Sequence, residues 1–311
     1  MAQTSAKPAK RSEGLGVGMV LLAAALWGAN GIFVNLLTAD GLSSTQITFT
    51  RMCSVPVIAW IALMLTDRKA LHIARQDVKW FVLNGVFGVY LFSLLYAVSI
   101  QFTGMATAAV LIYLMPSLVM VFSILFLGER FTGRKGLCLV LSLLGCALVS
   151  GLAGGLTLQV TGLLAGIGAA LCYTVYNIMI ATKLKAYAPL TIVLYSGLFA
   201  ALMSLLYTAF RGELLPMGAI YAASPAALVL NIFMGFACSV VTYFLYNSAV
   251  KIISPSKASI LATFEPIAAA LFGLVLFHEM LDGFGWLGIV CEIAALVLLQ
   301  LPEKKPHKMT V

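Results

Sequence analysis

The chain has 311 residues, of which 62% are apolar and only 10% are charged, and its formal net charge is +8. Soluble domains are roughly 45–50% apolar and about 25% charged, so this chain has too few polar side chains to coat a water-exposed globule. The composition disfavours soluble enzymes, nucleic-acid binders and secreted disulfide scaffolds. It predicts an all-α polytopic membrane protein, because helices satisfy their own backbone groups in lipid.

Ten apolar stretches have the length that a membrane-spanning helix requires. The first stretch is too long for a signal-peptide core, so we expect it to remain as the first span. A polar N-terminal tail, 1–14, precedes the spans, and a polar C-terminal tail, 302–311, follows them. The predicted spans are 15–37, 47–66, 78–100, 104–127, 136–152, 161–182, 190–210, 225–250, 257–277 and 285–301.

The basic residues alternate between the predicted loops as the positive-inside rule requires. With both termini in the cytoplasm, all 19 Lys and Arg residues except Arg51 and Arg211 fall in the tails, the cytoplasmic loops or the span ends beside them. A different number of spans would disturb this alternation. The basic residues form small groups without an aromatic-interleaved patch, so we expect no nucleic-acid partner.

The two halves of the chain repeat each other under shifts of 150 and 146 residues. Each half, 15–152 and 161–301, has five spans, and an odd number places the second half upside down relative to the first. Inverted repeats with a site at their interface are a recurrent transporter plan. The aligned pairs are Pro116 with Pro266, Glu129 with Glu279, Gly133 with Gly283, Tyr96 with Tyr246, Trp27 with Tyr173, and Asn30 with Tyr176.

Three formally charged residues, Arg51, Glu265 and Glu292, lie well within the predicted spans. A charge at mid-helix costs about 2.5–3.5 kcal/mol on insertion scales, so such residues usually face the bundle interior. Glu265 is predicted to bind a cationic group or a proton in a central cavity, or else to hold helices together as a neutral or paired acid. Arg51 either serves the site or reaches the lipid headgroups. Glu292 is interpreted as a packing or subunit-contact residue.

Aromatic and amide side chains recur on two helix faces. Tyr173, Tyr176 and Asn177 share one face by their spacing, and a second segment repeats this pattern. Buried Tyr and Asn need partners, which a hydrated cavity would supply; the alternative is an interfacial aromatic belt. The second segment and the further cavity candidates are Tyr243, Tyr246 and Asn247, with Trp27, Asn30, Tyr96, Thr107, Tyr113, Met115 and Thr263.

Pro116 and Pro266 lie inside predicted spans, where each removes a backbone donor and predicts a kink. Catalytic signatures such as His-Glu-x-x-His or a phosphate-binding Gly-rich loop are absent from the sequence, and the three histidines are scattered. The six cysteines lie in apolar segments and are expected to be free thiols. We therefore expect no metal, no cofactor and no enzymatic activity.

Three segments resemble the EamA-type transporters of the drug/metabolite transporter superfamily. They are ALWGANGIF in the first span, PSLVMVFSILFLGERFTG closing the first half, and FEPIAAALFGLVLFHEMLDGFGWLG closing the second. The resemblance covers about 15–301 and implies ten helices in two inverted five-helix repeats, with alternating access around a central cavity. Met115 stands where the second half has Glu265, so the cavity is expected to be asymmetric in charge.

The resemblance further implies a secondary transporter, an exporter of small polar or amphipathic metabolites such as amino acids or drugs, in a bacterial cytoplasmic (inner) membrane. A passive channel and a membrane-embedded enzyme are the alternatives. The expected partners are membrane lipids, a small-molecule substrate and a proton or counter-substrate. The sequence leaves the substrate, direction, coupling ion and oligomeric state open.

Overall fold

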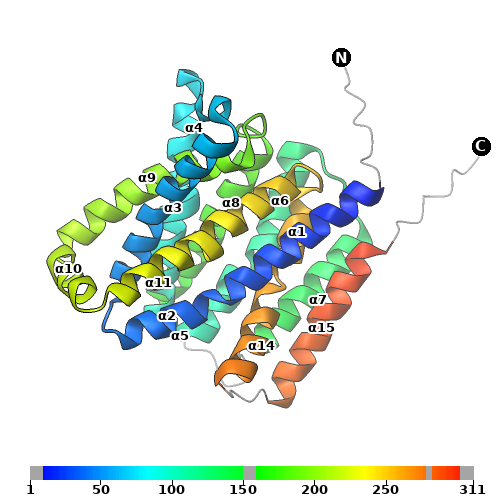
Figure 1. The fold of residues 1–311 in the computed structure, drawn as a ribbon. Helices are drawn as coiled ribbons and strands as arrows, with labels where there is room; N and C mark the ends of the chain where they lie inside the picture. The colour runs from blue at the N-terminus through cyan, green and yellow to red at the C-terminus, as the bar shows by residue number, and fades with distance from the viewer. Residues whose placement is uncertain (1–9, 150–158, 278–281, 302–311) are drawn as a thin grey trace, which may run out of the picture.

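The computed structural model describes residues 10–149, 159–277 and 282–301, and every regular element in these ranges is a helix (Figure 1). By length and hydropathy alone, seven stretches of the described residues qualify as membrane spans. The three other predicted spans coincide with shorter apolar helices. The prediction of an all-α membrane protein with ten spans is thus confirmed.

The first half of the chain supplies spans one to five. The first, third and fourth spans are each divided between consecutive elements. The elements are α1 (Lys10–Gly28), α2 (Asn30–Ala39), α3 (Ser44–Thr66), two 3-10 turns (Arg68–Leu71 and Arg75–Asp77), α4 (Val78–Leu83), a π-helical segment η3 (Asn84–Leu91), α5 (Phe92–Ile112), α6 (Met115–Leu127) and α7 (Gly133–Val149).

The second half supplies spans six to ten and one short helix in the predicted loop between spans 190–210 and 225–250. This helix, α10, is apolar, and its Met217 and Ile220 pack against a buried cluster that includes Leu37 and Leu42. The elements are α8 (Val160–Ala181), α9 (Pro189–Phe210), α10 (Leu214–Ala223), α11 (Pro225–Gly235), a π-helical segment η5 (Phe236–Val241), α12 (Thr242–Val250), α13 (Pro255–Ala262), α14 (Glu265–Phe277) and α15 (Gly283–Gln300).

The chain reverses direction within the range assigned to α5. A Cβ built on Gly166 of α8 would lie 2.8 Å from Ser99 Oγ and 2.6 Å from Leu111 Cδ1, so Ser99 and Leu111 lie side by side. A straight helix would separate these two residues by roughly 18 Å. The third and fourth spans are therefore antiparallel neighbours. The two predicted spans, 78–100 and 104–127, are thus separate, although the backbone stays helical through the break expected at 101–103.

The two prolines related by the repeat both follow helix breaks. The chain leaves the α-helix at Tyr113–Leu114 and at Thr263–Phe264, and Pro116 and Pro266 are each the second residue of the next helix. A proline at this position cannot donate a hydrogen bond to the turn before it, so a break there costs little. The fourth and ninth spans are consequently each two half-helices, α5/α6 and α13/α14.

The described ends of the chain lie on one side of the bundle, which we call the terminal side. Figure 1 shows the start of α1 and the end of α15 close together. Near this side, Lys257 Nζ of α13 lies 2.7 Å from Glu13 Oε1 of α1, and Arg134 of α7 donates a hydrogen bond to the Leu301 carbonyl. The opposite, far side carries the α2–α3 turn and α10, where Ser43 Oγ donates to Glu213 Oε2 at 2.6 Å.

The fifth and tenth spans, α7 and α15, pack along each other (Figure 1). Ser142 Oγ donates to Glu292 Oε1 at 3.1 Å, and these two residues are related by the 150-residue shift between the halves. Contact between repeat-related positions is what a two-fold axis produces. The axis between the inverted repeats therefore passes through this helix pair.

We predict that Gly85→Ala destabilises the bundle. A Cβ at Gly85 would lie 2.4 Å from the Ser196 backbone oxygen, so α9 would have to shift. Overpacking of this kind costs about 1–3 kcal/mol, and the melting temperature in detergent should fall. The control is Gly18→Ala in α1, whose Cβ would meet nothing within 4 Å. Equal melting temperatures for the two variants would contradict the predicted contact.

Candidate substrate cavity

A cavity of about 630 Å³ lies between the helices and reaches the surface on the far side. Its outer part is lined by the exposed residues Ser44, Gln101 and Arg211, which all lie at far-side helix ends. Its inner part is lined by Glu265 and by the aromatic residues near the middle of the spans. This volume is within the range of about 300–1,000 Å³ that is typical of small-molecule sites.

Eight of the predicted site residues line this cavity. They come from α1, α2, the third span, the α5–α6 break, α6, α8, α12 and α14, so both repeats contribute. Trp27 packs edge-on against Tyr243 with ring centroids 5.7 Å apart, which fixes part of the aromatic wall. The eight are Trp27, Asn30, Tyr96, Tyr113, Met115, Tyr173, Tyr243 and Glu265.

Glu265 is the first residue of α14, directly after the helix break. The α1 backbone approaches α14 closely here, because a Cβ built on Gly28 would lie 2.8 Å from both Glu265 O and Ala269 N. The Glu265 carboxylate makes no hydrogen bond or ion pair with the described residues, although it is only partly exposed. It is thus an acid held on a fixed backbone and open to the cavity.

Two arginines also line the cavity, and they differ in their partners. Arg211, at the far-side mouth, forms an ion pair with Glu213 at 3.1 Å. Arg51 of α3 lies deeper, and its side chain makes no hydrogen bond or ion pair with the described residues. Its backbone carbonyl accepts a hydrogen bond from Ser54 Oγ at 2.8 Å. Of the two interpretations left open by the sequence, the structure places Arg51 at the cavity.

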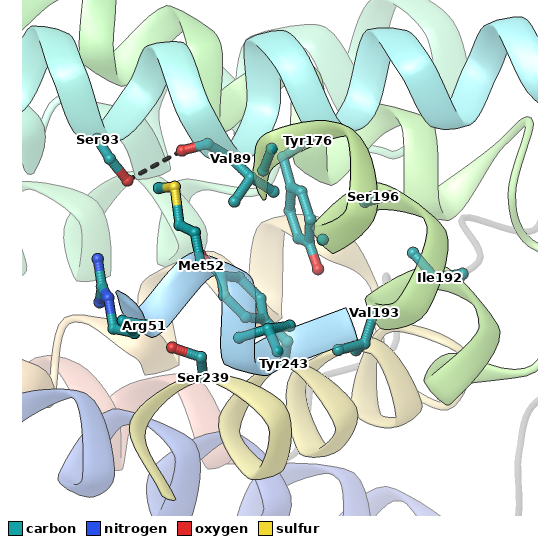
Figure 2. Close-up of a pocket in the computed structure, with 13 residues that line it drawn as sticks. Arg51, Met52, Val89, Ser93, Tyr176, Ile192, Val193, Ser196, Ser239 and Tyr243 are labelled. Carbon is teal, nitrogen blue, oxygen red and sulfur yellow. Dashed lines mark hydrogen bonds between the residues drawn. The ribbon is translucent and has the colours of Figure 1, made fainter. Parts of the chain in front are cut away.

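A side pocket of about 40 Å³ opens from the cavity beside Arg51 (Figure 2). Arg51, Met52, Ser93 and Tyr243 line both spaces. In the side pocket, Ser93 Oγ donates to the Val89 carbonyl at 2.9 Å, the contact dashed in Figure 2. The remaining polar lining comes from Tyr176, Ser196 and Ser239.

A reciprocal pair of hydrogen bonds joins α8 and α12 behind the cavity. Tyr176 OH donates to Asn247 Oδ1 at 2.7 Å, and Tyr246 OH donates to Asn177 Oδ1 at 2.5 Å. All four residues are buried. The repeated Tyr-x-x-Tyr-Asn spacing places the first tyrosine of each segment on the cavity wall. It places the second tyrosine and the asparagine in this reciprocal pair of hydrogen bonds.

Further contacts hold the terminal side together. Ser256 N donates to Glu129 Oε1 at 3.5 Å, and Lys135 pairs with the other Glu129 oxygen at 2.8 Å. In the loop before α9, Tyr187 OH donates to Asp77 Oδ2 at 2.5 Å. Burial and this hydrogen bond raise the pKa of the Tyr187 hydroxyl above its ordinary value. The cavity is thus closed on the terminal side and open on the far side.

Glu292 is buried away from the cavity, between α7 and the α13–α14 break. Its carboxylate accepts hydrogen bonds from Ser142, Thr263 and, at 3.6 Å, the Cys146 thiol. These contacts are all within the chain and match its interpretation as a packing residue. Because the side chain is fully buried, it is not available for a contact between subunits.

Several predicted cavity residues lie elsewhere. Asn177, Tyr246 and Asn247 form hydrogen bonds with one another or with Tyr176 behind the wall, although Asn247 Nδ2 is buried without a partner among the described residues. Thr263 donates to Ile260 O and Glu292 instead of facing the cavity. Tyr176 lines only the side pocket. The side chain of Thr107 and the whole of Glu279 lie outside the described residues.

Sequence reasoning missed a set of hydroxyl groups that line the cavity or its side pocket. Ser93 precedes Tyr96 by three residues, and Ser239 precedes Tyr243 by four, so each shares a helix face with a residue already singled out. That spacing was the available signal. The missed residues include Ser93, Ser239, Thr45, Thr48, Tyr90 and Tyr207.

The cavity offers charge, hydroxyls and aromatic surface. Within the described ranges, no three His, Cys, Asp or Glu side chains are grouped as metal ligands. The arrangement can hold a small molecule by ionic and aromatic contacts. A helical membrane protein built from two inverted repeats around such a cavity belongs, by its architecture, to the class of membrane transporters.

The chain belongs to the EamA-like transporter family, whose profile matches residues 14–151 and 160–301. It is 25% identical over 295 residues to the uncharacterized inner membrane transporter YicL of Salmonella typhimurium, covering 92% of this chain and 95% of the relative. It is 29% identical to an uncharacterized transporter of Archaeoglobus fulgidus, covering 86% of this chain and 89% of the relative. The resemblance inferred from the sequence is thereby confirmed.

A solved structure described only as a crystal structure of a protein has the same fold. It superposes with a TM-score of 0.76 over 92% of this chain and 96% of its own length, at 18% sequence identity. At this identity the likeness concerns the fold alone. It agrees with the two-repeat arrangement of the helices.

We predict that Tyr176→Phe and Tyr246→Phe each destabilise the protein. Either change removes a donor and leaves a buried asparagine oxygen without its partner, which costs about 1–3 kcal/mol. Thermal unfolding in detergent measures the effect. Tyr207→Phe is the matched control, because the Tyr207 hydroxyl has no hydrogen bond within the described part of the chain. Equal melting temperatures for all three variants would contradict a stabilising role of the two tyrosine–asparagine hydrogen bonds.

Proposed function

We propose that this protein is a secondary transporter that exports small polar or amphipathic metabolites, with amino acids and drugs as the expected classes, across a bacterial cytoplasmic membrane by alternating access. The observation that carries this proposal is a polar cavity that reaches one surface only. With both termini in the cytoplasm, the far side is external, and the described conformation is outward-open. The basic residues of the terminal side support that orientation.

The repeat relation supports the alternating mechanism. The terminal side is closed by Tyr176–Asn247 and Tyr246–Asn177, which all belong to the second repeat. The positions related to Tyr176 and Tyr246 are Asn30 and Tyr96, in the first repeat. Asn30 and Tyr96 line the open cavity, and Asn30 Oδ1 is buried without a hydrogen-bond partner among the described residues. Exchange of the two repeat conformations would bring these helices together and close the far side.

Two other functions are less well supported. A passive channel requires a path open on both sides, whereas this cavity is closed on the terminal side. A membrane-embedded enzyme requires a nucleophile, a base or a metal placed together. The cavity brings together one acid, two arginines and aromatic residues, which suit binding better than bond cleavage.

We predict that Glu265→Gln lowers gradient-driven transport at least tenfold, because it removes the only carboxylate among the described residues that line the cavity. Proteoliposomes are loaded with a panel of labelled amino acids and metabolites, with and without a proton gradient, and counterflow is recorded. Asp40→Asn, an exposed carboxylate change on the far side, is the control. Unchanged coupled transport in Glu265→Gln would contradict its role, and flux without counterflow would favour a channel.

We predict that the far side is external and open. In a variant without the six native cysteines, Thr48→Cys in the cavity should react with a membrane-impermeant maleimide added to intact cells. Gln76→Cys, exposed on the terminal side, should react only after the cells are permeabilised. The opposite labelling pattern would reverse the orientation, and a protected Thr48→Cys would contradict an outward-open cavity.

A further inference from the structure

The Arg51 guanidinium is a cation with five N–H donors, part-buried in a spanning helix and without a partner among the described residues. Charged groups within membrane spans normally pair with one another or face a water-filled pathway. Arg211 in the same cavity illustrates the first case, since it pairs with Glu213 at 3.1 Å. Arg51 and Glu265 line the same space and form no ion pair with each other. The cavity therefore keeps an available positive charge.

The surroundings of Arg51 fit a small anionic group. Ser239 and Tyr243 line the side pocket beside it, and neither hydroxyl makes a hydrogen bond with the described residues. Figure 2 shows Arg51, Ser93 and Ser239 around one end of this pocket. The space of about 40 Å³ is larger than the roughly 10–15 Å³ that a cavity needs to hold one water molecule, so it can take a group with more than one polar atom.

We propose that Arg51 is the anchor for a carboxylate of the transported molecule, so that the substrates are small carboxylic acids. This inference rests on the proposed transport function and specifies its substrate class. The guanidinium forks onto both carboxylate oxygens, and the hydroxyls of Ser239 and Tyr243 donate to the same group. The rest of the molecule lies in the main cavity against the aromatic wall.

Ligand-dependent thermal stability of the purified protein in detergent tests the anchor. The probes are alanine, leucine, phenylalanine and 4-methylpentanoate, each compared with its own primary amide. An acid that binds should raise the melting temperature of the wild type more than its amide does. Arg51→Gln should weaken acid binding by about tenfold or more and remove this preference, because a charge-assisted fork is lost.

Two further variants keep the test decisive. Arg51→Lys retains the charge but lacks the two-pronged guanidinium, so it should show an intermediate preference for the acid over its amide. This graded result would show that the loss of preference in Arg51→Gln is not caused by a folding defect. Arg75→Gln makes the same chemical change at an exposed terminal-side position and should behave as the wild type. The proposal is overturned if no acid stabilises the wild type more than its amide, or if Arg51→Gln keeps the preference.

Counterflow of the same acids in proteoliposomes separates the two proposals. If the wild type binds acids through Arg51 but shows no counterflow, the transport function fails and the anchor stands. If the wild type transports and Arg51→Gln transports the same acids with equal affinity, the anchor fails and the transport function stands.

Discussion

The structure depends on one constraint: lipid offers no hydrogen-bond partners, so every polar group within the spans must find one in the protein or in a water-accessible space. Two sets of residues show how the chain responds to this constraint. Tyr176, Tyr246 and Glu292 are satisfied by neighbouring helices, and those contacts hold helices together. Arg51 and Glu265 are not satisfied by the protein, and they lie where the helices separate. For these five residues, the presence or absence of a partner separates the packed interface from the cavity.

The two proline-linked breaks place different residues at equivalent points of the two repeats. Met115 begins α6 and Glu265 begins α14, and both line the cavity. The same backbone device therefore presents a thioether on one wall and a carboxylate on the other. The two repeats thus share a backbone arrangement but present different side chains, so the cavity carries its carboxylate on one wall. Arg51 of α3 adds a positive charge to this asymmetric lining.

The sequence was sufficient for the number of spans and the repeat, because apolar length, loop charge and aligned prolines are properties of the chain itself. It was also sufficient for Glu265, since a lone acid in an apolar span is conspicuous. It was not sufficient to predict that Tyr243 lines the cavity and that Tyr246 does not. Both lie on one helix face, and only the rotation of α12 against α8 decides which faces the cavity and which pairs with Asn177. The α10 helix was missed because it is only ten residues long and its contacts, through Met217 and Ile220, are tertiary.

The contact between Ser142 and Glu292 has a particular consequence because the two residues occupy equivalent places in the two halves. If the two repeats exchange conformations, Ser142 takes the surroundings of Glu292 and Glu292 those of Ser142. The contact between them is then kept. The contacts that close the terminal side and the far side must form and break during transport, whereas the Ser142–Glu292 contact can persist. Under the proposed exchange of conformations, the α7–α15 pair stays in place while the two gates move, and Glu292 serves helix packing and not substrate binding.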